Sequence, residues 1–455
     1  LGSGTGTTTV DTTLFSISNS SGIIRFQDVV FSSTTPISIT NSPNVVIFYK
    51  TPYVFSSDIT LSNGNVTFEG SDITLDSNVS ITGSGDVTVH AEDKDTTLIT
   101  DAGQLSTREA KVHVDGNIST TGNITLLADV MRDVNIISAS EISLASSSLA
   151  TVEVGSGAVL SGATINLTAR TFGNVISDAG TNANAQNQFT ESATVSIVQA
   201  ASVNATALDL LAETATHYSA NSLVPSNDIS GNVKAYIENT TVVVGTGGVK
   251  LTAKDSSRLT ATSPRLAINL NSPSLPLSFD RTTASNKLNR NIEAYLKDSV
   301  VTVTNGDIEL FAQRDVRLIA EATSASMSGN NLDTGMFTFS LGGTFSVNTI
   351  LGNIKAYIEN GSASTLTSGD ILVDAKDTSV IDAKSELSAT ISRDSSFVNG
   401  RVIPPYSLLQ PSKSIGVSVA LNFIGWDISN LFSLALSELL GAPLSTDEKA
   451  VLVTA

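Results

Sequence analysis

Apolar and hydroxyl-bearing residues alternate along most of the chain, in short segments separated by Gly, Asn, Asp and Ser. The segments Asp58–Leu61, Asn65–Phe68 and Asp86–Val89 place Val, Ile, Leu or Phe at every second position, with Thr between them. A period of two, β-branched residues and turn-forming punctuation are typical of short β-strands. The pattern predicts an all-β chain with strands of about four or five residues.

One strand pattern recurs: an apolar residue, any residue, a second apolar residue, any residue, and then Ala. Its final residues are Ala91, Ala128, Ala169, Ala212, Ala253, Ala312 and Ala375, and a variant ends at Ser146. Most of the spacings lie near multiples of about 20 residues, which is one turn of a parallel β-solenoid. With an average of about 20–28 residues per turn, we therefore expect one elongated parallel β-helix of about 16–22 turns, about 80–105 Å long at about 4.8 Å per turn.

A longer unit is repeated in the second half of the chain. Three segments share an Ala-Tyr pair flanked by Asn, Lys and Glu, and they are Asn232–Asn239, Asn291–Asp298 and Asn353–Asn360. Their tyrosines, Tyr236, Tyr295 and Tyr357, follow one another at intervals of about 60 residues. At about 20 residues per turn this unit would span about three turns, so the tyrosines would not lie in adjacent turns.

A fourth copy begins at Gly416–Gly425, which matches Gly343–Gly352 position by position, and is then interrupted. Apolar residues in Ser429–Leu440 fall near helical spacing, and Gly441 and Pro443 follow as stop signals. We expect one short helical insertion near the C-terminus, before the strand residues Lys449–Val453. The chain would then stop partway through a longer solenoid.

Four polar stretches rich in Asn or Pro lie between the repeated strands, and we interpret them as loop insertions on one face of the solenoid. They are residues 174–191, 221–230, 264–289 and 394–413. The chain then divides into an irregular N-terminal β segment or continuation of the solenoid (1–55), solenoid turns with loops (56–230), turns with duplicated units of about 60 residues (231–425), and the helical insertion with the start of a further repeat (426–455).

These repeats resemble a known family. The likeness rests on Asn-Val-Lys-Ala-Tyr-Ile-Glu-Asn at 232–239, Val-Lys-Leu-Thr-Ala-Lys-Asp-Ser-Ser at 249–257, the segment Gly416–Gly425 and the insertion 426–441. Over about residues 195–455 the chain resembles the repeats of very large bacterial surface proteins of the leukotoxin-type filamentous adhesin family. The resemblance implies a right-handed parallel β-helix that is secreted, displayed at the cell surface and used in adhesion or matrix building.

Composition narrows the classes of function. The chain has 25 Lys and Arg against 43 Asp and Glu, a net charge of −18, and no basic run, so nucleic acid is not an expected partner. It has no Cys, which excludes disulfides, thiolate metal sites and Cys nucleophiles. Its apolar runs are too short for a transmembrane helix. We expect an extracellular or cell-surface location, with any signal peptide removed or outside this sequence.

Calcium is the metal that the sequence accommodates best. Asp86, Asp307 and Asp370 each follow a Gly and precede an apolar strand residue, so carboxylates one turn apart could bind Ca²⁺. Gly-Asp is also ordinary turn chemistry, and the nonapeptide calcium pattern is absent. His90 and His113 lie about one predicted turn apart and could stack around a metal, although a metal site usually needs three or four ligands. No other cofactor is expected.

Paired carboxylates would mark a carbohydrate-cleaving β-helix enzyme. The candidates by spacing are Glu69 with Asp72, Glu92 and Asp93 with Asp95, and Glu141. No aromatic platform accompanies them, so we interpret them as solvated turn charges and expect no catalytic residues. Tyr236, Tyr295 and Tyr357 could stack on sugars, or pack beneath a loop.

The sequence therefore predicts a structural module of an exported bacterial surface adhesin or extracellular filament, a rigid stalk or scaffold for adhesion or self-assembly. Its expected partners are further copies of itself, end to end or laterally, and host or matrix glycans or proteins. The alternatives are a carbohydrate-binding or carbohydrate-cleaving β-helix protein and a calcium-stabilised surface rod.

Overall fold

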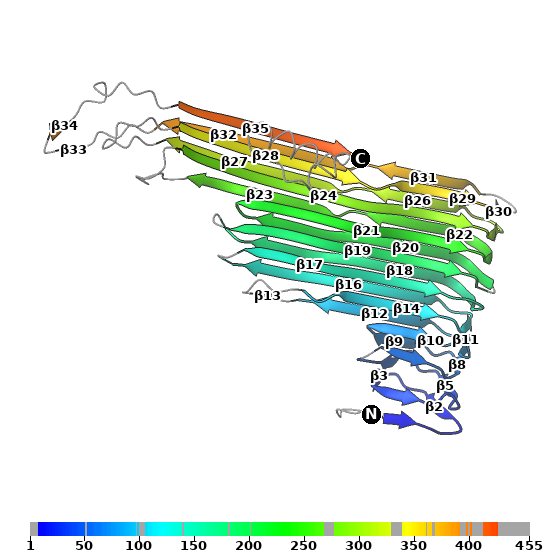
Figure 1. The fold of residues 1–455 in the computed structure, drawn as a ribbon. Coiled ribbons are helices and arrows are strands. Elements are labelled where there is room, and N and C mark those ends of the chain that lie inside the picture. The colour runs from blue at the N-terminus through cyan, green and yellow to red at the C-terminus, as the bar shows by residue number, and fades with distance from the viewer. Residues whose placement is uncertain are drawn as a thin grey trace, which may run out of the picture.

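The computed structural model describes residues 8–50, 52–96, 98–99, 105–138, 141–180, 183–200, 202–267, 277–328, 339–360, 362–365, 369–391, 397–398, 401–402 and 413–425. Within these residues the chain is all-β and its strands stack in parallel (Figure 1). The exception is the short antiparallel pair β33 (Phe397–Val398) and β34 (Arg401–Val402). The predicted helix at 429–440 lies outside the described residues.

The chain is a parallel β-helix, because each strand pairs with the equivalent strand of the turns before and after it. One stack of such strands contains β2 (Phe15–Ser18), β5 (Ile37–Thr40), β8 (Ile59–Ser62), β11 (Ser80–Ser84), β15 (Asn117–Thr120), the starts of β18 (Val159–Asp178), β20 (Ser202–Asn221) and β22 (Thr241–Asp255), then β25 (Val300–Val303) and β30 (Ser362–Thr365).

A second stack continues the same sheet. It contains β3 (Ile24–Gln27), β6 (Val45–Phe48), β9 (Val66–Gly70), β12 (Val87–Asp95), β16 (Ile124–Ile137), the middle of β18, β20 and β22, then β26 (Ile308–Arg314) and β31 (Ile371–Asp377). A third stack extends it, with β13 (Leu98–Ile99), the ends of β16, β18 and β20, then β23 (Arg258–Ala267), β27 (Arg317–Ser328) and β32 (Val380–Ile391).

The opposite wall is a separate sheet. It contains β7 (Tyr53–Phe55), β10 (Asp72–Leu75), β14 (Arg108–Val114), β17 (Ile142–Val154), β19 (Asn184–Val198), β21 (Val224–Glu238), β24 (Leu277–Lys297), β28 (Phe339–Leu351) and β29 (Ile354–Glu359), which both pair with β24, and β35 (Lys413–Ile424). Before it in the chain, β1 (Thr8–Val10) pairs with β4 (Val29–Phe31).

The turns become longer along the chain, which corrects the prediction that they average about 20–28 residues. In the first stack the equivalent residues are Phe15, Ile37, Ile59, Ile81, Ile118, Leu160, Val203, Val242, Val301 and Ala363. The first three steps advance by about 22 residues each, and the last two by about 60 residues each. The ten strands rise about 43 Å at about 4.8 Å per step, so the stack is shorter and wider than the predicted rod (Figure 1).

The added residues lengthen strands, because the stretches predicted as loops are largely strand. Residues 174–178 end β18, 184–191 begin β19, 224–230 begin β21 and 277–289 begin β24. Their inward positions are often polar, as at Asn187, Asn227 and Asn286, so they lack the apolar alternation from which strands are predicted. Most of 394–413 lies outside the described residues.

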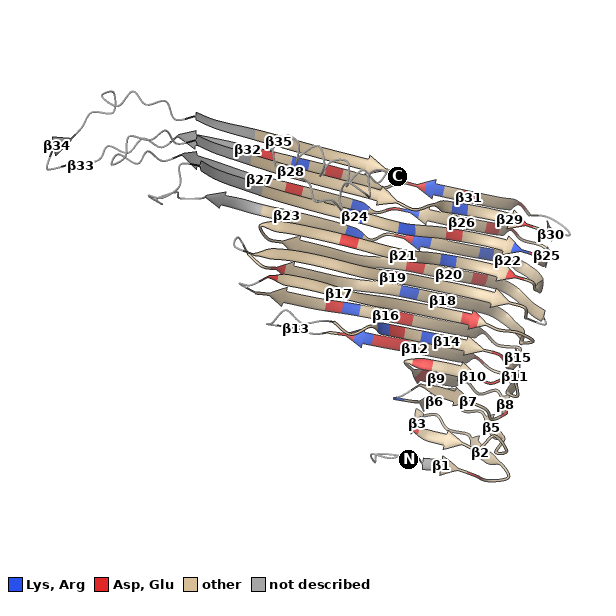
Figure 2. Cartoon of the chain, in the orientation of Figure 1, with Lys and Arg blue, Asp and Glu red and all other residues tan. Residues whose placement is uncertain are grey.

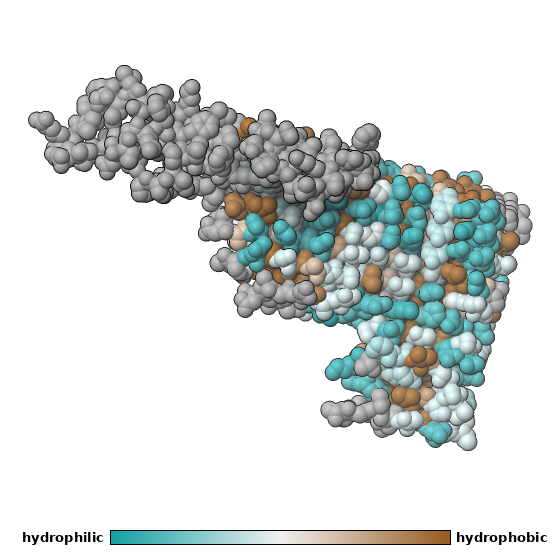
Figure 3. Space-filling view, in the orientation of Figure 1, coloured by the Kyte–Doolittle hydropathy of each residue, from teal (hydrophilic) through white to brown (hydrophobic). Residues whose placement is uncertain are grey.

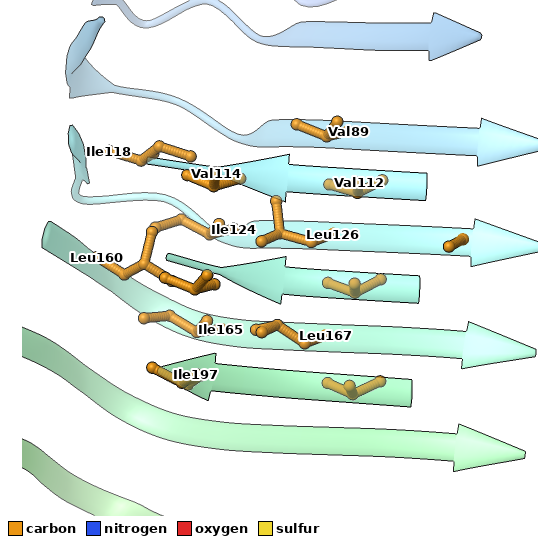
Figure 4. Packing of buried hydrophobic residues seen from close by; sticks show 14 of the residues in the cluster. Val89, Val112, Val114, Ile118, Ile124, Leu126, Leu160, Ile165, Leu167 and Ile197 are labelled. Atoms are coloured by element: carbon orange, nitrogen blue, oxygen red, sulfur yellow. The ribbon is translucent and has the colours of Figure 1, made fainter. Parts of the chain in front are cut away.

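The Ala residues that end the repeated strand pattern occupy equivalent positions in successive turns. This confirms that the pattern is one strand, repeated once per turn. Ala91, Ala128, Ala169, Ala212, Ala253, Ala312 and Ala375 are in register in one column. Ser146 is not part of it, because it lies in β17 on the opposite sheet and pairs with Phe189. Val, Ile and Leu from both sheets fill the core beside this column (Figure 4). Each fully buried side chain of this kind contributes about 1.5–3 kcal/mol.

Asn and Asp residues in the left-handed conformation turn two corners of the solenoid. Asn19, Asn41 and Asn63 have φ of 56°, 49° and 54°, and Nδ2 of Asn63 and of Asn41 each donates to Oδ1 of the preceding Asn at 3.2 and 3.1 Å. Asn239, Asp298 and Asn360 repeat the same conformation in the wide turns, with φ of 51°, 48° and 49°. Short polar side chains tolerate this region of φ, so each corner is fixed locally.

Candidate functional site

The turn carboxylates proposed for calcium act as hydrogen-bond acceptors between turns. Oδ1 of Asp86 accepts from the backbone N–H of Asn123, and Oδ1 of Asp307 accepts from that of Asp370, both at 2.8 Å. Asp307 and Asp370 lie in adjacent turns, but five turns separate Asp86 from Asp307. Within the described residues, no group of three or more His, Asp or Glu side chains is arranged to hold a metal ion.

His90 and His113, whose spacing would allow a stacked pair, lie on different sheets. His90 is in β12 beside Glu69 and Leu127 of the neighbouring turns, and its Nε2 is 3.4 Å from Oδ2 of Asp129. His113 is in β14 on the opposite sheet. The two histidines therefore do not stack, because they belong to the same turn and lie on its two opposite walls.

Each of these histidines contacts its own carboxylates. Nε2 of His113 is 2.9 Å from Asp115 and its Nδ1 is 3.4 Å from Glu153. Asp129 also accepts from Nε and Nη2 of Arg170 at 2.8 and 2.9 Å. Burial raises the pKa of Asp129, but the hydrogen bonds and charges of His90 and Arg170 outweigh this effect, so the pKa lies below its usual value.

The first candidate carboxylate pair is split between the two sheets. Glu69 lies in β9 and forms an ion pair with Arg25 at 2.9 Å. Asp72 begins β10 on the opposite sheet, where it pairs in register with Lys111. Glu141 is exposed and lies just before β17.

The second group of carboxylates is occupied by basic side chains. Glu92 is 2.6 Å from Nζ of Lys94. Asp93 and Asp95 lie 3.1 and 3.4 Å from the guanidinium of Arg108. Each of these carboxylates therefore has a basic structural partner. The contacts do not arrange them as a catalytic pair around a bound sugar.

The three repeated tyrosines lie in adjacent turns and stack on one another, which corrects the prediction that they are separated. Tyr236, Tyr295 and Tyr357 are in register in β21, β24 and β29. Their ring centroids are 4.7 and 4.9 Å apart, with interplanar angles of 9° and 8°. The repeated unit is therefore one turn, because the turn itself has grown to the length of the unit.

Stacking changes what the tyrosines can do. Each ring covers the face of its neighbour, and Tyr295 in the middle is only 9% exposed. Burial and then the neighbouring tyrosines raise the pKa of Tyr295, so its hydroxyl stays neutral at physiological pH. The column presents ring edges and hydroxyls, whereas sugar stacking needs an open ring face.

Charged columns flank the tyrosines on both sides. Lys234, Glu293 and Lys355 are in register on one side, and Glu238, Lys297 and Glu359 on the other. Nζ of Lys234 is 2.9 Å from Glu293, and Nζ of Lys297 is 3.6 Å from Glu238. Figure 2 shows the same intermixing of basic and acidic residues along neighbouring strands.

Inside the wide turns, a buried polar layer separates two apolar cores. Along β20 the inward residues are Ala212 in one core, Thr214 and Thr216 in the layer, and Tyr218 and Ala220 in the other core. The narrow turns before residue 95 carry no such second core in the residues described.

Arg290 is the centre of this layer and is fully buried. Its Nη2 donates to Oε2 of Glu191 at 2.8 Å, and its Nη1 donates to Oδ1 of Asp255 at 2.8 Å. The same Nη1 contacts the hydroxyls of Thr214 and Ser257 at 2.8 and 2.9 Å. Burial lowers the pKa of Arg290, but the charges of Asp255 and Glu191 outweigh this effect and raise it above its usual value.

Two further buried arginines continue the layer along the solenoid. Arg132 is 2% exposed and donates to Ser148 Oγ at 3.2 Å and to the backbone oxygen of Ser147 at 3.1 Å. Arg314 is 3% exposed, lies 3.3 Å from Asp377, and donates to the backbone oxygen of Arg290 at 3.0 Å. Burial lowers the pKa of both guanidinium groups.

An asparagine ladder forms a second polar element inside the wide turns. Its members are Asn187, Asn227, Asn286, Asn348 and Asn422. Each Nδ2 donates to Oδ1 of the next member, at 2.8, 2.8, 2.9 and 3.0 Å. Nδ2 of the first four also donates to a backbone oxygen of the third stack, at 2.7–3.3 Å. The ladder therefore ties the two sheets together in successive turns.

The last pair of the ladder corrects one alignment. The match of Gly343–Gly352 to Gly416–Gly425 places Asn348 opposite Leu421. β28 and β35 do pair, but Asn348 lies opposite Asn422, one position further along the chain. The register follows the buried amides, because a buried amide without a partner costs about 1–3 kcal/mol.

Sequence reasoning missed the buried arginines and the ladder, although a signal was present. Asn227, Asn286 and Asn348 each lie nine residues before Tyr236, Tyr295 and Tyr357 respectively. A polar residue at a constant offset from an outward-facing residue marks a constant place in the turn. Nine is odd, so the strand alternation places the amide on the inner face.

No described helix is long and apolar enough to cross a membrane. Comparison with protein-family models, with curated proteins and with solved structures gives no match to this chain. The pairing of its strands shows a parallel β-helix.

Proposed function

We propose that this chain is a structural module of an exported bacterial surface protein, a rigid scaffold for adhesion or self-assembly. The observation that carries the proposal is the use of its polar groups. Carboxylates, guanidinium groups and amides that could serve chemistry are joined to the next turn or to the opposite sheet, as at Asp307, Arg290 and Asn286. Polar groups used in this way make the solenoid rigid. This use of the polar groups supports a mechanical role for the chain.

The exterior supports the same proposal. In the view of Figure 3, hydrophilic and near-neutral side chains cover most of the described surface, with hydrophobic ones interspersed. A net charge of −18 spread over such a surface favours solubility and disfavours non-specific association. The parts of the proposal that concern export, surface display and adhesion come from the resemblance of the repeats to the adhesin family.

Surface display is tested on intact producing cells. Immunogold labelling with antibodies to the folded chain should decorate the cell exterior, and external protease should remove the label. Label confined to the interior of the cells would overturn the proposal.

The scaffold role is tested by removing one turn. Ile37 pairs with Ile59, so deletion of residues 38–59 removes one complete narrow turn and rejoins a strand in register, without touching the buried polar layer. This variant should fold with native-like circular dichroism and a smaller radius of gyration. Deletion of 38–58 is the control, because one residue fewer turns the inner face of the rejoined strand outward. Equal stability of the two variants would contradict a register-dependent scaffold.

Two alternatives predict different solution behaviour. A calcium-stabilised rod should lose thermal stability in excess chelator. A polysaccharide-cleaving enzyme should release reducing or unsaturated ends, and should stop when the responsible carboxylate is changed to its amide. The scaffold proposal expects neither effect.

A further inference from the structure

The outer surface of three adjacent turns carries nine side chains in three columns, which we call the tyrosine face. The columns are Lys234, Glu293 and Lys355; Tyr236, Tyr295 and Tyr357; and Glu238, Lys297 and Glu359. Each row holds one Lys and one Glu on opposite sides of a Tyr. The sign of the charge also reverses from one row to the next within each outer column.

The tyrosine face is nearly flat. The three rings come from one register position of successive strands and are parallel within 9° and 8°, so the column keeps one direction from turn to turn. Alternate residues of a strand are about 6.6 Å apart and turns are about 4.8 Å apart, so the charged columns lie about 13 Å from each other over a height of about 10 Å. Flat columns of this kind can meet a second flat surface row by row.

A second copy of the same face is its electrostatic complement in one orientation. Consider a twofold axis that runs along the tyrosine column, midway between two copies facing each other. This rotation exchanges left and right and keeps each row at its height. Lys234 then faces Glu238 of the second copy, Glu293 faces its Lys297, and Lys355 faces its Glu359, so opposite charges meet in every row.

The other face-to-face twofold arrangement is unfavourable. An axis across the strands keeps left and right but inverts the order of the rows. Lys234 would then meet Lys355, and Glu293 would meet Glu293 of the second copy. Like charges placed opposite each other across an interface suppress that arrangement.

We infer that the tyrosine face is a lateral contact between two parallel copies of this chain, with tyrosine edges against tyrosine edges. The inference rests on the proposed scaffold function and deepens it by naming the partner and its orientation. The tyrosines supply rigid, amphipathic contact area at the centre of the patch, and the charged rows supply orientation. The patch is smaller than the roughly 800 Å² per partner of a standard interface, so the contact is weak between single copies.

Turns that precede the tyrosine face carry charged side chains, and some of these also meet opposite charges across the same twofold axis. Lys111 and Asp115 flank His113 four turns before Tyr295, and they would again face each other across the axis. Glu153 lies on the axis itself and would face its own copy, at a cost reduced by His113 at 3.4 Å. Glu153→Gln should therefore strengthen the association.

Zero-length carbodiimide cross-linking of the full chain tests the orientation. Unlabelled and ¹⁵N-labelled protein are mixed, cross-linked and digested. Mixed-isotope peptides should join Lys234 to Glu238, Lys297 to Glu293 and Lys355 to Glu359. Within one copy these groups are about 13 Å apart along a strand, whereas the contact of Lys234 with Glu293 should give links of single isotope.

Charge variants test the cause. Glu293→Lys and Lys297→Glu should each lower the association constant by about tenfold in sedimentation experiments, because each places like charges in the central row. The double variant Glu293→Lys with Lys297→Glu should restore it, since the two outer columns then carry opposite charges throughout. Lys250→Glu, an exposed change on β22, is the control and should have no effect.

The outcomes separate this inference from the function on which it rests. Absence of mixed-isotope links at high protein concentration, or an unchanged association constant in the single variants, overturns the lateral contact while leaving a folded, surface-displayed scaffold. Failure of surface labelling overturns the scaffold proposal, whatever the cross-links show.

Discussion

The narrow turns at the N-terminal end and the wide turns that follow build their interiors in different ways. The narrow turns advance by about 22 residues per step, and their core includes Phe26, Phe31 and Phe55. The widest turns advance by about 60 residues and contain three apolar clusters, with Arg290 and its partners between the first two.

The difference teaches how a solenoid becomes wider without changing its fold. Two sheets about 10 Å apart have an interior of fixed thickness, so widening can only lengthen the strands. A long and uniformly apolar interior would tolerate shifts of register between turns. The buried arginines and the asparagine ladder give each long strand fixed points, because a shift would leave charges and amides without partners.

The largest effect should come from removing the centre of the polar layer. Arg290→Met leaves Glu191 and Asp255 buried without their cation, so we expect a loss of about 3–5 kcal/mol in the free energy of unfolding. Urea denaturation followed by circular dichroism measures it. Arg25→Met, which removes the partly exposed pair with Glu69, is the control and should cost at most about 1 kcal/mol. Similar losses in the two variants would mean that the polar layer has no special role.

Apolar truncations should cost less and act equally in both regions. Ile59→Ala in a narrow turn and Leu210→Ala in a wide turn each remove a fully buried side chain, and about 2–4 kcal/mol is expected for each. Hydrogen exchange followed by mass spectrometry should show the faster exchange in the substituted turn and its neighbours. A uniform increase over the whole chain would contradict stability that sums over neighbouring turns.

The asparagine ladder should contribute a smaller amount in the wide turns alone. Asn286→Ala breaks two bonds to other members of the ladder and one to the Ile319 backbone oxygen, so a loss of about 1–3 kcal/mol is expected. Asn63→Gly in the exposed corner of the narrow turns keeps the left-handed conformation accessible and should change stability by about 0.5 kcal/mol. Thermal unfolding of both variants, compared with the parent, tests this order.

The smallest effect concerns pH and lies in the wide turns. Burial, and then Arg258, lower the pKa of His217 below its usual value of about 6.5. The unfolded chain therefore binds the proton more readily than the folded chain. The contribution of His217 to stability is complete above about pH 6.5 and is lost as the pH falls through the folded pKa. His217→Gln should show a shallower loss of stability over this range, and an unchanged slope would contradict the assignment.

The fold class could be predicted from the sequence, because the residues of the core that contains the Ala column alternate regularly with outward-facing residues. Ala91 to Ala375 form one inward column, and their pattern predicted a parallel β-helix. The turn length did not follow from this pattern, because the long repeat fits three short turns as well as one long turn. The stacking of Tyr236 on Tyr295 decides between them.

The polar elements could be predicted only in part. Gly-Asp pairs such as Gly306-Asp307 indicated turns, and the carboxylate does bind the following turn. Glu191, Asp255 and Arg290 are distant in sequence and meet only when three strands from the two sheets are in register. Their spacing carries no local signature, so the buried layer required the structure.

The growth in turn length also has a mechanical consequence. Tension along the solenoid axis pulls against the hydrogen bonds between successive turns in the direction in which they point. β2 and β5 share four residue pairs, whereas β18 pairs with β20 along nearly all of its 20 residues. Under load the narrow turns should open at the lowest force and the wide turns at the highest force. The resistance of the molecule to tension therefore increases from one end of the solenoid to the other.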